Sequence, residues 1–470
     1  MRFAHTVAQI RAAEQPLLEA GVPLMARAST ALAIIASRHL SFVYGGRVVL
    51  LGGGGNNGAD ALHAGASLAR RGVAVVAIPV GTPVPDALEA FLKAGGRIGT
   101  SDALAGADLV LDGLVGIGAK GPLRPEAAEL IRQITSPVIA VDVPSGVDAD
   151  TGAVSEGALR ADLTVTFGSL KPGLLLARDH VGELELVDLG LRPLDATVEV
   201  LQAADVAERL PTPERSHDKY SRGVVGVAAG SPTYPGAAVL SVGAAIAAGA
   251  GMVRFAGAPK AADLIRQRWP EAVVTEAVGA EVVKAGRVQA WVVGPGLGTD
   301  DQARATVEAV LSQDVPVLVD AGALTICSQD PDLVRHRQAP TLLTPHDREF
   351  ARFGHDVGND RLGAAKALAA DLGVHVLLKG DATIVVGPDG PARINTTGSA
   401  LLATAGSGDV LAGAVGALLA QGLNPTDAAS VGAWLHGTAA IICAEGTSAS
   451  RLVDAWSRAV QAARTGDSTA

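Results

Sequence analysis

Residues 47–72 read RVVLLGGGGNNGADALHAGASLARRG, and this stretch decides the fold class. Its apolar start predicts a buried strand, because valines and leucines follow one another without a polar interruption. Glycines come next, and the alanine-rich stretch after them predicts a helix over residues 59–72 that ends at Gly72. A strand, a glycine turn and a helix in this order indicate an α/β protein with a parallel sheet.

The same alternation continues along the chain with one interruption. Apolar runs at residues 73–79, 107–116 and 137–146 are separated by helical stretches, as in a parallel sheet covered on both faces. The segment LPTPERSHDKYSRG, residues 210–223, breaks the pattern with prolines and polar residues, and a new alternation then begins. We therefore predict two α/β domains, residues 1–205 and residues 206–464.

Composition excludes several classes of function. The 470 residues carry a formal charge of −10 and only 3% aromatic side chains, which disfavours a nucleic-acid surface. No signal-peptide core or uninterrupted apolar span is visible, so we expect a cytoplasmic protein without membrane partners. Cys327 and Cys443 lack metal-ligand spacing, and we expect both to be buried as small apolar residues.

Polar residues follow three of the predicted strands of the first half. Asn57 follows the glycines, Asp112 ends the next apolar run, and Ser145 follows another. Open α/β sheets bind ligands at these strand ends. The carboxylate and the neutral oxygens suit a hard, weakly charged cation, and the glycine turn suits a phosphate. The alternative for Asp142 and Ser145 is that they only cap a turn.

These stretches resemble the NAD(P)H-hydrate epimerase family, or YjeF N-terminal domain, over about residues 9–191. The similarity lies in QIRAAE, LMARA, NNGAD, LDGLVGIGAKGP, DVPSGVDADTG and TFGSLKPGL. It implies a Rossmann-like three-layer α/β/α domain and a potassium site at Asn57, Asp112 and Ser145. It implies that the hydrate contacts Asn56, Asn57, Gly58, Ala59, Asp60, Gly116, Ile117, Gly118, Ala119, Lys120, Gly121, Pro122 and Asp142, with Asp142 in the acid/base role.

One departure from that family concerns the glycine turn. The family pattern is N-N-G-G-D-G, whereas this chain has Ala59 and Ala61 at the fourth and sixth positions. A non-glycine residue costs on the order of 1 kcal/mol or more where φ must be positive. We expect Ala61, inside a helix, to be harmless, and Ala59 to be the position that matters.

The second half carries a different site in TAGSGDVLAG, residues 404–413. The backbone N–H groups of Gly406, Ser407 and Gly408 would form an anion hole where a helix begins. Asp409 in the first turn could then take a proton from a substrate hydroxyl during phosphoryl transfer. An aspartate at a helix start is also an ordinary cap, which is the alternative interpretation.

This motif resembles the G-x-G-D anion hole of the ribokinase-like superfamily. VVGPGLG, LVDAGAL, LTPHDREF and VLLKGDATIV extend the similarity to the ADP-dependent NAD(P)H-hydrate dehydratase family over about residues 210–446. The resemblance implies a ribokinase-like α/β/α domain that uses Mg²⁺ and ADP. It implies hydrate contacts at Ala237, Gly296, His346 and Asp409, and nucleotide contacts at Lys379, Gly380, Asp381, Ala382, Thr383 and Gly408.

Two further departures concern charged residues. Arg348 replaces the glycine usual before Glu349, and it must point outward or contact phosphate. In HDKYSRG the lysine does not directly follow the histidine, so Lys219 is a weakly supported candidate for a phosphate-side cation.

Together the two resemblances imply a bifunctional repair enzyme. One half would epimerise the R and S hydrates of NADH and NADPH (NADHX and NADPHX), and the other would dehydrate the S form with ADP. We expect these small molecules as partners, and a homo-oligomer. The alternatives are a vitamin-precursor kinase, which shares the G-x-G-D hole, and a binding protein with a lapsed N-terminal site.

Overall fold

The computed structural model describes residues 1–119, 121–192 and 195–466. The chain divides into two compact units, Phe3–Val198 and Met1–Arg2 with Glu199–Ala470. The short strands β1 (Arg2–Ala4) and β9 (Val198–Val200) stand where the units divide. Each unit is described by itself below.

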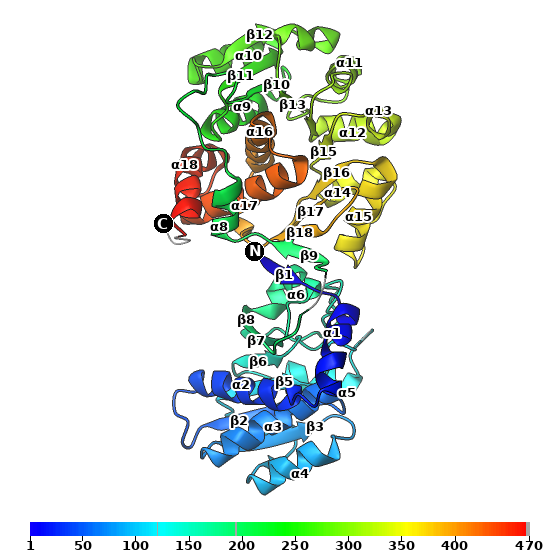
Figure 1. Cartoon of the computed structure of the whole chain (residues 1–470), viewed down its shortest axis with the longest axis vertical. Helices are drawn as coiled ribbons and strands as arrows, with labels where there is room; N and C mark the ends of the chain where they lie inside the picture. The colour runs from blue at the N-terminus through cyan, green and yellow to red at the C-terminus, as the bar shows by residue number, and fades with distance from the viewer. Residues whose placement is uncertain (120, 193–194, 467–470) are drawn as a thin grey trace. The chain divides into compact units, whose positions relative to one another are not determined.

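The N-terminal unit is built on a parallel sheet (Figure 1). Its strands run in the order β4-β3-β2-β5-β6-β7-β8. The strands are β2 (Arg47–Gly52), β3 (Ala74–Pro79), β4 (Arg97–Ile98), β5 (Leu109–Gly113), β6 (Val138–Val141), β7 (Leu163–Phe167) and β8 (Glu183–Val187). The helices are α1 (Val7–Glu19), α2 (Leu24–Arg38), α3 (Asn56–Arg70), α4 (Pro85–Lys93), α5 (Pro125–Arg132), α6 (Pro172–Leu176) and α7 (Arg178–Val181), with the 3₁₀ helix η1 (Ser101–Leu104).

Alternate residues of one strand enter two different cores. Leu50 of β2 packs in a cluster with Phe91 of α4, and α2 and α3 supply most of the other helical members. Leu51, the next residue, packs in a second cluster with Leu130 of α5. Because successive side chains point to opposite faces, the uninterrupted apolar run of this strand requires helices on both sides of the sheet.

The C-terminal unit contains a larger mixed sheet. Its strands are β10 (Val224–Ala228), β11 (Met252–Gly257), β12 (Val273–Glu276), β13 (Ala290–Val293), β14 (Val317–Val319), β15 (Thr341–Leu343), β16 (His375–Leu378), β17 (Thr383–Val386) and β18 (Ala392–Asn395). They run in the order β18-β17-β16-β15-β14-β13-β10-β11-β12. Pairing is parallel from β12 to β16, and β16, β17 and β18 pair antiparallel.

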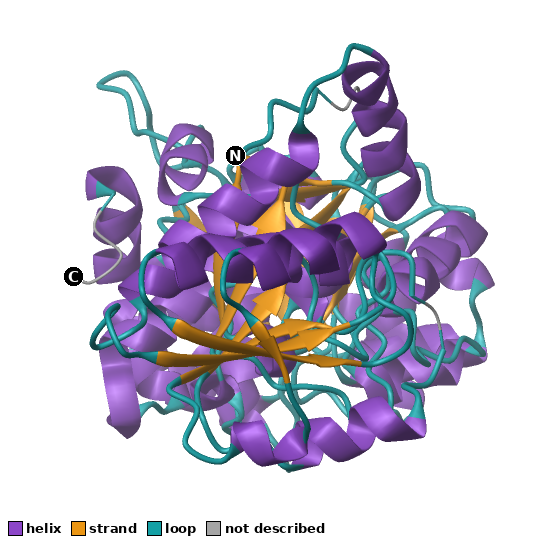
Figure 2. Cartoon of the chain, turned by 90° about the horizontal axis from the view of Figure 1, so that it is seen from below, coloured by secondary structure: helices purple, strands orange, loops and turns teal. Residues whose placement is uncertain are grey.

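Figure 2 shows strands between layers of helices, and helices of the C-terminal unit likewise pack against its sheet. They are α8 (Ala203–Arg209), α9 (Pro235–Ala247), α10 (Pro259–Arg268), α11 (Asp301–Leu311), α12 (Gly322–Gln329), α13 (Asp332–Arg335), α14 (Asp347–Phe350), α15 (Arg361–Leu372), α16 (Ser407–Ala420), α17 (Pro425–Cys443) and α18 (Ala449–Thr465). The 3₁₀ helices are η2 (Gly279–Ala285), η3 (Ala351–Phe353), η4 (Ala400–Leu402) and η5 (Ala444–Gly446).

Small residues let α16 lie close to its neighbours. Val225 of β10 and Val292 of β13 belong to the same core as the buried residues of α16. A methyl group added at Gly413 of α16 would overlap the backbone of Ser241 in α9. The predicted fold class, two α/β domains with helices on both sheet faces, is confirmed.

Two other expectations concerned the burial of the cysteines and membrane-spanning helices. Cys327 is buried, as expected, but Cys443 is only half-buried because it lies at the end of α17. Across the described residues, no single helix is long and apolar enough to cross a membrane, although α1 and α2 meet the test as a pair bent by 112°.

Candidate active sites

The glycine turn of the N-terminal unit opens α3 earlier than predicted. The helix begins at Asn56 rather than Ala59, so Asn56–Asp60 form its first turns at the carboxyl end of β2. A methyl group at Gly58 would overlap the backbone of Gly53, which shows how tightly the turn folds onto the helix start. The N–H groups where a helix begins are suited to bind an anion.

Asn57, Asp112 and Ser145 are brought together by the ends of α3, β5 and β6. The Ser145 hydroxyl donates to Asp112 Oδ1 at 2.7 Å, and the Ser145 N–H donates to Asp112 Oδ2 at 2.8 Å. Asn57 Nδ2 donates to the carbonyls of Val115 and Val141 at 2.6 and 2.8 Å. Because both amide hydrogens are used, Asn57 Oδ1 is left as an acceptor.

Asp112 is completely buried, and the described residues give it no cationic partner. Burial raises its pKa to about 6, although hydrogen bonds from Ser145 and Leu114 act in the opposite direction. A buried carboxylate without a counter-ion is costly, so this arrangement favours a bound cation.

Asp142 follows β6 and is held by Lys171. Its φ of 68° lies in the left-handed region, which is uncommon for a residue other than glycine. Lys171 Nζ lies 2.5 Å from Asp142 Oδ1, and the same oxygen accepts from Thr166 Oγ1 at 3.1 Å and the Phe167 N–H at 3.2 Å. Lys171 is almost fully buried, so its charge is directed at Asp142. The sequence interpretation missed Lys171, although it quoted the SLKPG motif that contains it.

Two further carboxyl groups lie in the field of Asp142. Burial, Asp142 and Glu14 raise the pKa of Asp60 to about 8, so Asp60 is mostly protonated at neutral pH. Its Oδ1 is buried and has no hydrogen-bond partner among the described residues. Burial and Asp142 also raise the pKa of Glu14, a residue of α1 that the sequence did not single out.

The second glycine-rich loop, residues 116–122, follows β5 and borders the same site. A methyl group at Gly116 would come within 3.0 Å of Asn57 Cβ, so this loop lies directly against the start of α3. Ser155 Oγ donates to the carbonyl of Gly121 at 3.1 Å and ties down its far end. Lys120, a predicted contact, lies outside the described residues.

Ala59 and Ala61 both lie inside α3 and are fully buried. Ala59 is not among the described residues with positive φ, so the strain considered for it does not arise. The Ala61 methyl packs against β5, because a Cβ added at Gly113 would come within 2.7 Å of it.

The anion-hole sequence of the C-terminal unit forms the start of α16. Gly406 is the N-cap residue with a φ of 87°, a conformation that glycine adopts without strain. Ser407 Oγ donates to the carbonyl of Leu402 at 2.8 Å and holds the turn. Asp409 lies in the first helical turn, and burial together with the charge of Asp320 raises its pKa to about 6.

Lys379 pairs with two carboxylates beside this helix start and lies in the field of a third, Asp409. Its Nζ lies 2.8 Å from Asp320 Oδ1 and 3.7 Å from Glu349 Oε2. A methyl group added at Gly408 would lie 3.7 Å from the same ammonium, and Lys379 in turn lowers the pKa of Asp409. Asp320 also accepts from Thr344 Oγ1 at 2.9 Å. The sequence analysis had assigned no site role to Asp320 or Glu349.

The predicted nucleotide loop, residues 379–383, turns between β16 and β17. Arg361 holds it, because its Nη2 donates to the Lys379 carbonyl at 3.0 Å while its Nη1 binds both carboxylate oxygens of Asp347 at 2.8 Å. His346 caps α14, and its Nδ1 accepts from the backbone of Arg348 and Glu349. Arg348 is exposed, which agrees with an outward direction.

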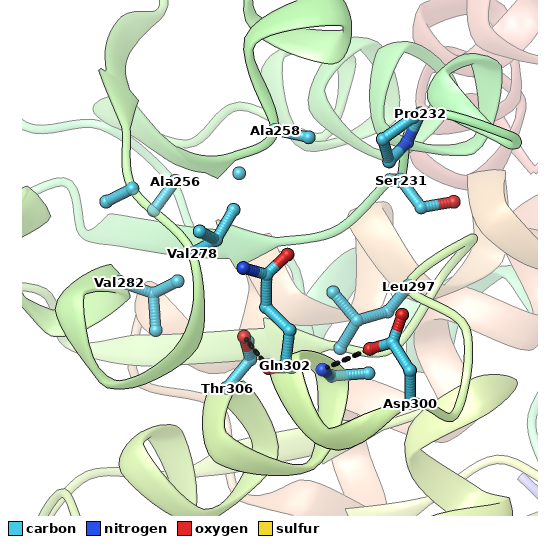
Figure 3. A pocket seen from close by; sticks show the side chains of 14 residues that line it. Ser231, Pro232, Ala256, Ala258, Val278, Val282, Leu297, Asp300, Gln302 and Thr306 are labelled. Atoms are coloured by element: carbon cyan, nitrogen blue, oxygen red, sulfur yellow. Dashed lines mark hydrogen bonds between the residues drawn. The ribbon is translucent and has the colours of Figure 1, made fainter.

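Ala237 and Gly296 meet at the carboxyl ends of β10 and β13. A methyl group at Gly296 would lie 2.6 Å from Ala237 Cβ. Next to them, the loops after β10 to β13 surround a pocket with walls that include Ala256, Val278 and Leu297 (Figure 3). Gln302 and Asp300 at the start of α11 supply polar groups, and Asp300 accepts from the Ala303 N–H at 2.8 Å.

Lys219 does not lie at this site. Its turn precedes β10 and packs on Gly251, just before β11, at the amino ends of these strands. Gly223 in the same segment packs on Ala420 at the carboxyl end of α16, opposite to Asp409. The proposed phosphate-side role of Lys219 is therefore wrong.

His436 of α17 is a buried group that the sequence interpretation missed. Burial lowers its pKa to about 4, while a hydrogen bond with the backbone of Ser407 acts in the opposite direction. The imidazole is therefore neutral at pH 7 and supports the turn that opens α16. It sits inside an apolar helix, where no sequence signal distinguishes a supporting histidine from an ordinary core residue.

Comparison with known proteins extends these observations. A family model described as NAD(P)H-hydrate dehydratase matches residues 225–461, and one described as YjeF-related protein N-terminus matches residues 22–173. The bifunctional NAD(P)H-hydrate repair enzyme Nnr of Mycobacterium leprae (strain TN) is 48% identical over 476 residues, covering 96% of this chain and 98% of that protein. The chain belongs to the bifunctional NAD(P)H-hydrate repair enzymes. Its Mycobacterium tuberculosis relative (strain H37Rv) of the same name is 50% identical over 446 residues, covering 92% of each protein.

A solved structure resembles the C-terminal unit. The ADP/ATP-dependent NAD(P)H-hydrate dehydratase from Bacillus subtilis, co-crystallised with ATP/Mg²⁺, is 30% identical with a TM-score of 0.50 and covers 56% of this chain and 97% of that chain. The predicted family and the pairing of an epimerase domain with a dehydratase domain are confirmed. Membership in this family disfavours the vitamin-precursor kinase alternative.

Proposed function

We propose that the N-terminal unit interconverts the R and S hydrates of NADH and NADPH, and that the C-terminal unit converts the S hydrate to NAD(P)H with ADP as phosphoryl donor. The observation that carries this proposal is the meeting of Asp409, Lys379 and Gly408 at the start of α16. A base, a cation and a set of helix N–H groups at one point are what phosphoryl transfer to a hydroxyl needs.

The dehydration then proceeds in two steps. Asp409 takes the proton from the hydrate hydroxyl while the β-phosphoryl group of ADP moves to that oxygen, which leaves AMP. Lys379 and the N–H groups at the start of α16 stabilise the charge on the transferred group. The ring nitrogen next expels phosphate, which leaves far more readily than hydroxide, and the adjacent ring carbon then loses a proton to solvent, which restores the double bond of NAD(P)H.

Mg²⁺ fits beside the same groups. Magnesium sites with nucleotides use one or two carboxylates together with phosphate oxygens and waters. Asp320 and Glu349 supply such carboxylates next to Lys379. When bound, the ion would neutralise phosphate charge, while this chain's residues orient the hydroxyl and remove its proton.

Potassium fits the N-terminal unit. Asp112, Ser145 and the free Oδ1 of Asn57 offer one buried negative charge and neutral oxygens, which suits a singly charged hard cation. The ion would supply the positive charge that Asp112 lacks. Asp142 carries the proton exchange through Oδ2, because Lys171, Thr166 and the Phe167 N–H all bind its Oδ1.

The pocket of Figure 3 is suited to the part of the hydrate that is remote from the reacting ring. It adjoins the loop that carries Gly296 and the start of α9, which carries Ala237, and its walls are mainly apolar with a few polar groups. Small-molecule and cofactor sites commonly have this composition.

The test uses a mixture of both NADH hydrates and measures NADH absorbance. Purified chain with ADP should convert the S hydrate quickly and the R hydrate afterwards, faster than spontaneous epimerisation allows. Reactions without ADP, with ATP in its place and with chain omitted are the controls. Faster conversion with ATP than with ADP would overturn the donor assignment, and a stall after the S hydrate would overturn the epimerase assignment.

A further inference from the structure

Helix α1 of the N-terminal unit is fixed against the loops of the epimerase site. The Val7 N–H at its start donates to Asp150 Oδ1 at 2.7 Å, in the loop that follows Ser145. His5 Nδ1, just before the helix, lies 2.6 Å from Ser169 Oγ, in the loop that carries Lys171. Ile117 of the second glycine-rich loop packs in the same apolar clusters as residues of α1.

Arg11 on this helix reaches the second glycine-rich loop. A methyl group added at Gly118 would lie 2.6 Å from Arg11 Nη2, so the absence of a side chain at Gly118 leaves room for the guanidinium. Arg11 is exposed, and within the described parts of the chain it forms no ion pair or hydrogen bond through its side chain. Its charge is therefore available to a ligand that lies against this loop.

The acidic and basic groups of the site lie in two different places. Glu14, one helical turn after Arg11, lies in the field of Asp142, Lys171 and Arg11, and Asp60 lies in the field of Glu14 and Asp142. The carboxyl groups therefore gather on the side of Asp142, whereas Arg11 lies over the glycine-rich loop. A ligand with an uncharged ring and a distant anionic group fits this separation.

We propose that Arg11 is a substrate-binding residue that holds the diphosphate of the dinucleotide against the second glycine-rich loop. This inference rests on the proposed epimerase function, and it adds α1 to the site. A guanidinium binds phosphate oxygens through paired N–H groups, which Lys cannot reproduce in the same geometry. The ordinary alternative is that Arg11 is a solvated surface residue.

The experiment measures epimerisation of the pure R hydrate of NADH in the full-length chain, with excess ADP so that the chain's own dehydratase half reports the S hydrate formed. R11A is compared with R38A, a matched control that removes an exposed arginine from α2 of the same unit. R11A should raise KM for the R hydrate about tenfold or more, because a charge-assisted hydrogen bond is lost. Its kcat should stay near that of the unmodified chain, and R38A should change neither value.

Three further measurements separate binding from a structural role. The KM of the unmodified chain should rise with added tetramethylammonium chloride at fixed potassium, and this dependence should weaken in R11A. The hydrate of reduced nicotinamide riboside carries no phosphate, so the unmodified chain and R11A should turn it over at equal rates. G118A should raise KM in the same direction, because its methyl group displaces the guanidinium.

The outcomes distinguish this inference from the proposed function. If the unmodified chain does not convert the R hydrate, the epimerase assignment fails and this inference falls with it. If the chain converts the hydrate and R11A behaves like R38A, only the inference about Arg11 is overturned. An equal loss by R11A on the riboside hydrate would also overturn it, because that substrate has no diphosphate.

Discussion

The acid limb of the dehydratase pH profile should belong to Asp409. Burial and the nearby charge of Asp320 raise its pKa from 3.8 to about 6, and a base must be deprotonated to act. With that pKa, about half of the chains hold the active carboxylate at pH 6 and about a tenth at pH 5. The rate on saturating S hydrate and ADP should therefore fall about twofold and then about tenfold as pH drops from 7.5.

The assay follows NADH absorbance after quenching to neutral pH, with an ADP-free reaction subtracted at every pH. D409N should lose about 10²–10⁴-fold in rate, the usual contribution of a general base. D320N should move the remaining acid limb to lower pH, because it removes a charge that raises the pKa of Asp409. A flat profile between pH 7.5 and 5, or a D409N rate above about a third of the unmodified chain, would refute the base assignment.

The other predictions concern the N-terminal unit and Lys219. D112A should abolish potassium activation of R-hydrate consumption while S-hydrate dehydration continues, and equal loss of both rates would indicate misfolding instead. A59G should lower the free energy of unfolding by roughly 0.5–1 kcal/mol in a denaturant titration, since Ala59 is a helix-interior residue, and it should not speed epimerisation. K219A should leave the KM for ADP unchanged, because Lys219 lies at the opposite edge of the sheet, and a severalfold increase would contradict that placement.

The local sequence was sufficient to predict which residues lie close together where a candidate site is formed by the ends of neighbouring strands. Asn57, Asp112 and Ser145 each follow a predicted strand, and parallel strands end at one edge of the sheet, so their approach could be expected. The start of α16 could be expected for a similar reason, because a glycine turn before an apolar helix specifies both a helix start and its free N–H groups.

Other features depend on which segments pack against each other in three dimensions. Lys171 and Asp142 are separated by 29 residues, and Lys379 and Asp320 by 59, and no spacing rule connects either pair. For Lys219 the sequence predicted a contact that the structure does not contain. Its charge and its position near a motif suggested a phosphate contact, but the direction of β10 places it at the other end of the strands.

The sequence by itself therefore determined the two α/β domains, the sheet edges where the candidate sites lie and the glycine turn that opens α16, because these follow from backbone periodicity and chain direction. The tertiary structure alone decided which distant groups lie together: the Arg11 guanidinium against Gly118, Glu14 in the field of Asp142, and Asp320 beside Lys379. The physical reason is that electrostatic interactions depend on distance and burial, and both are set by packing between elements that lie far apart in the chain.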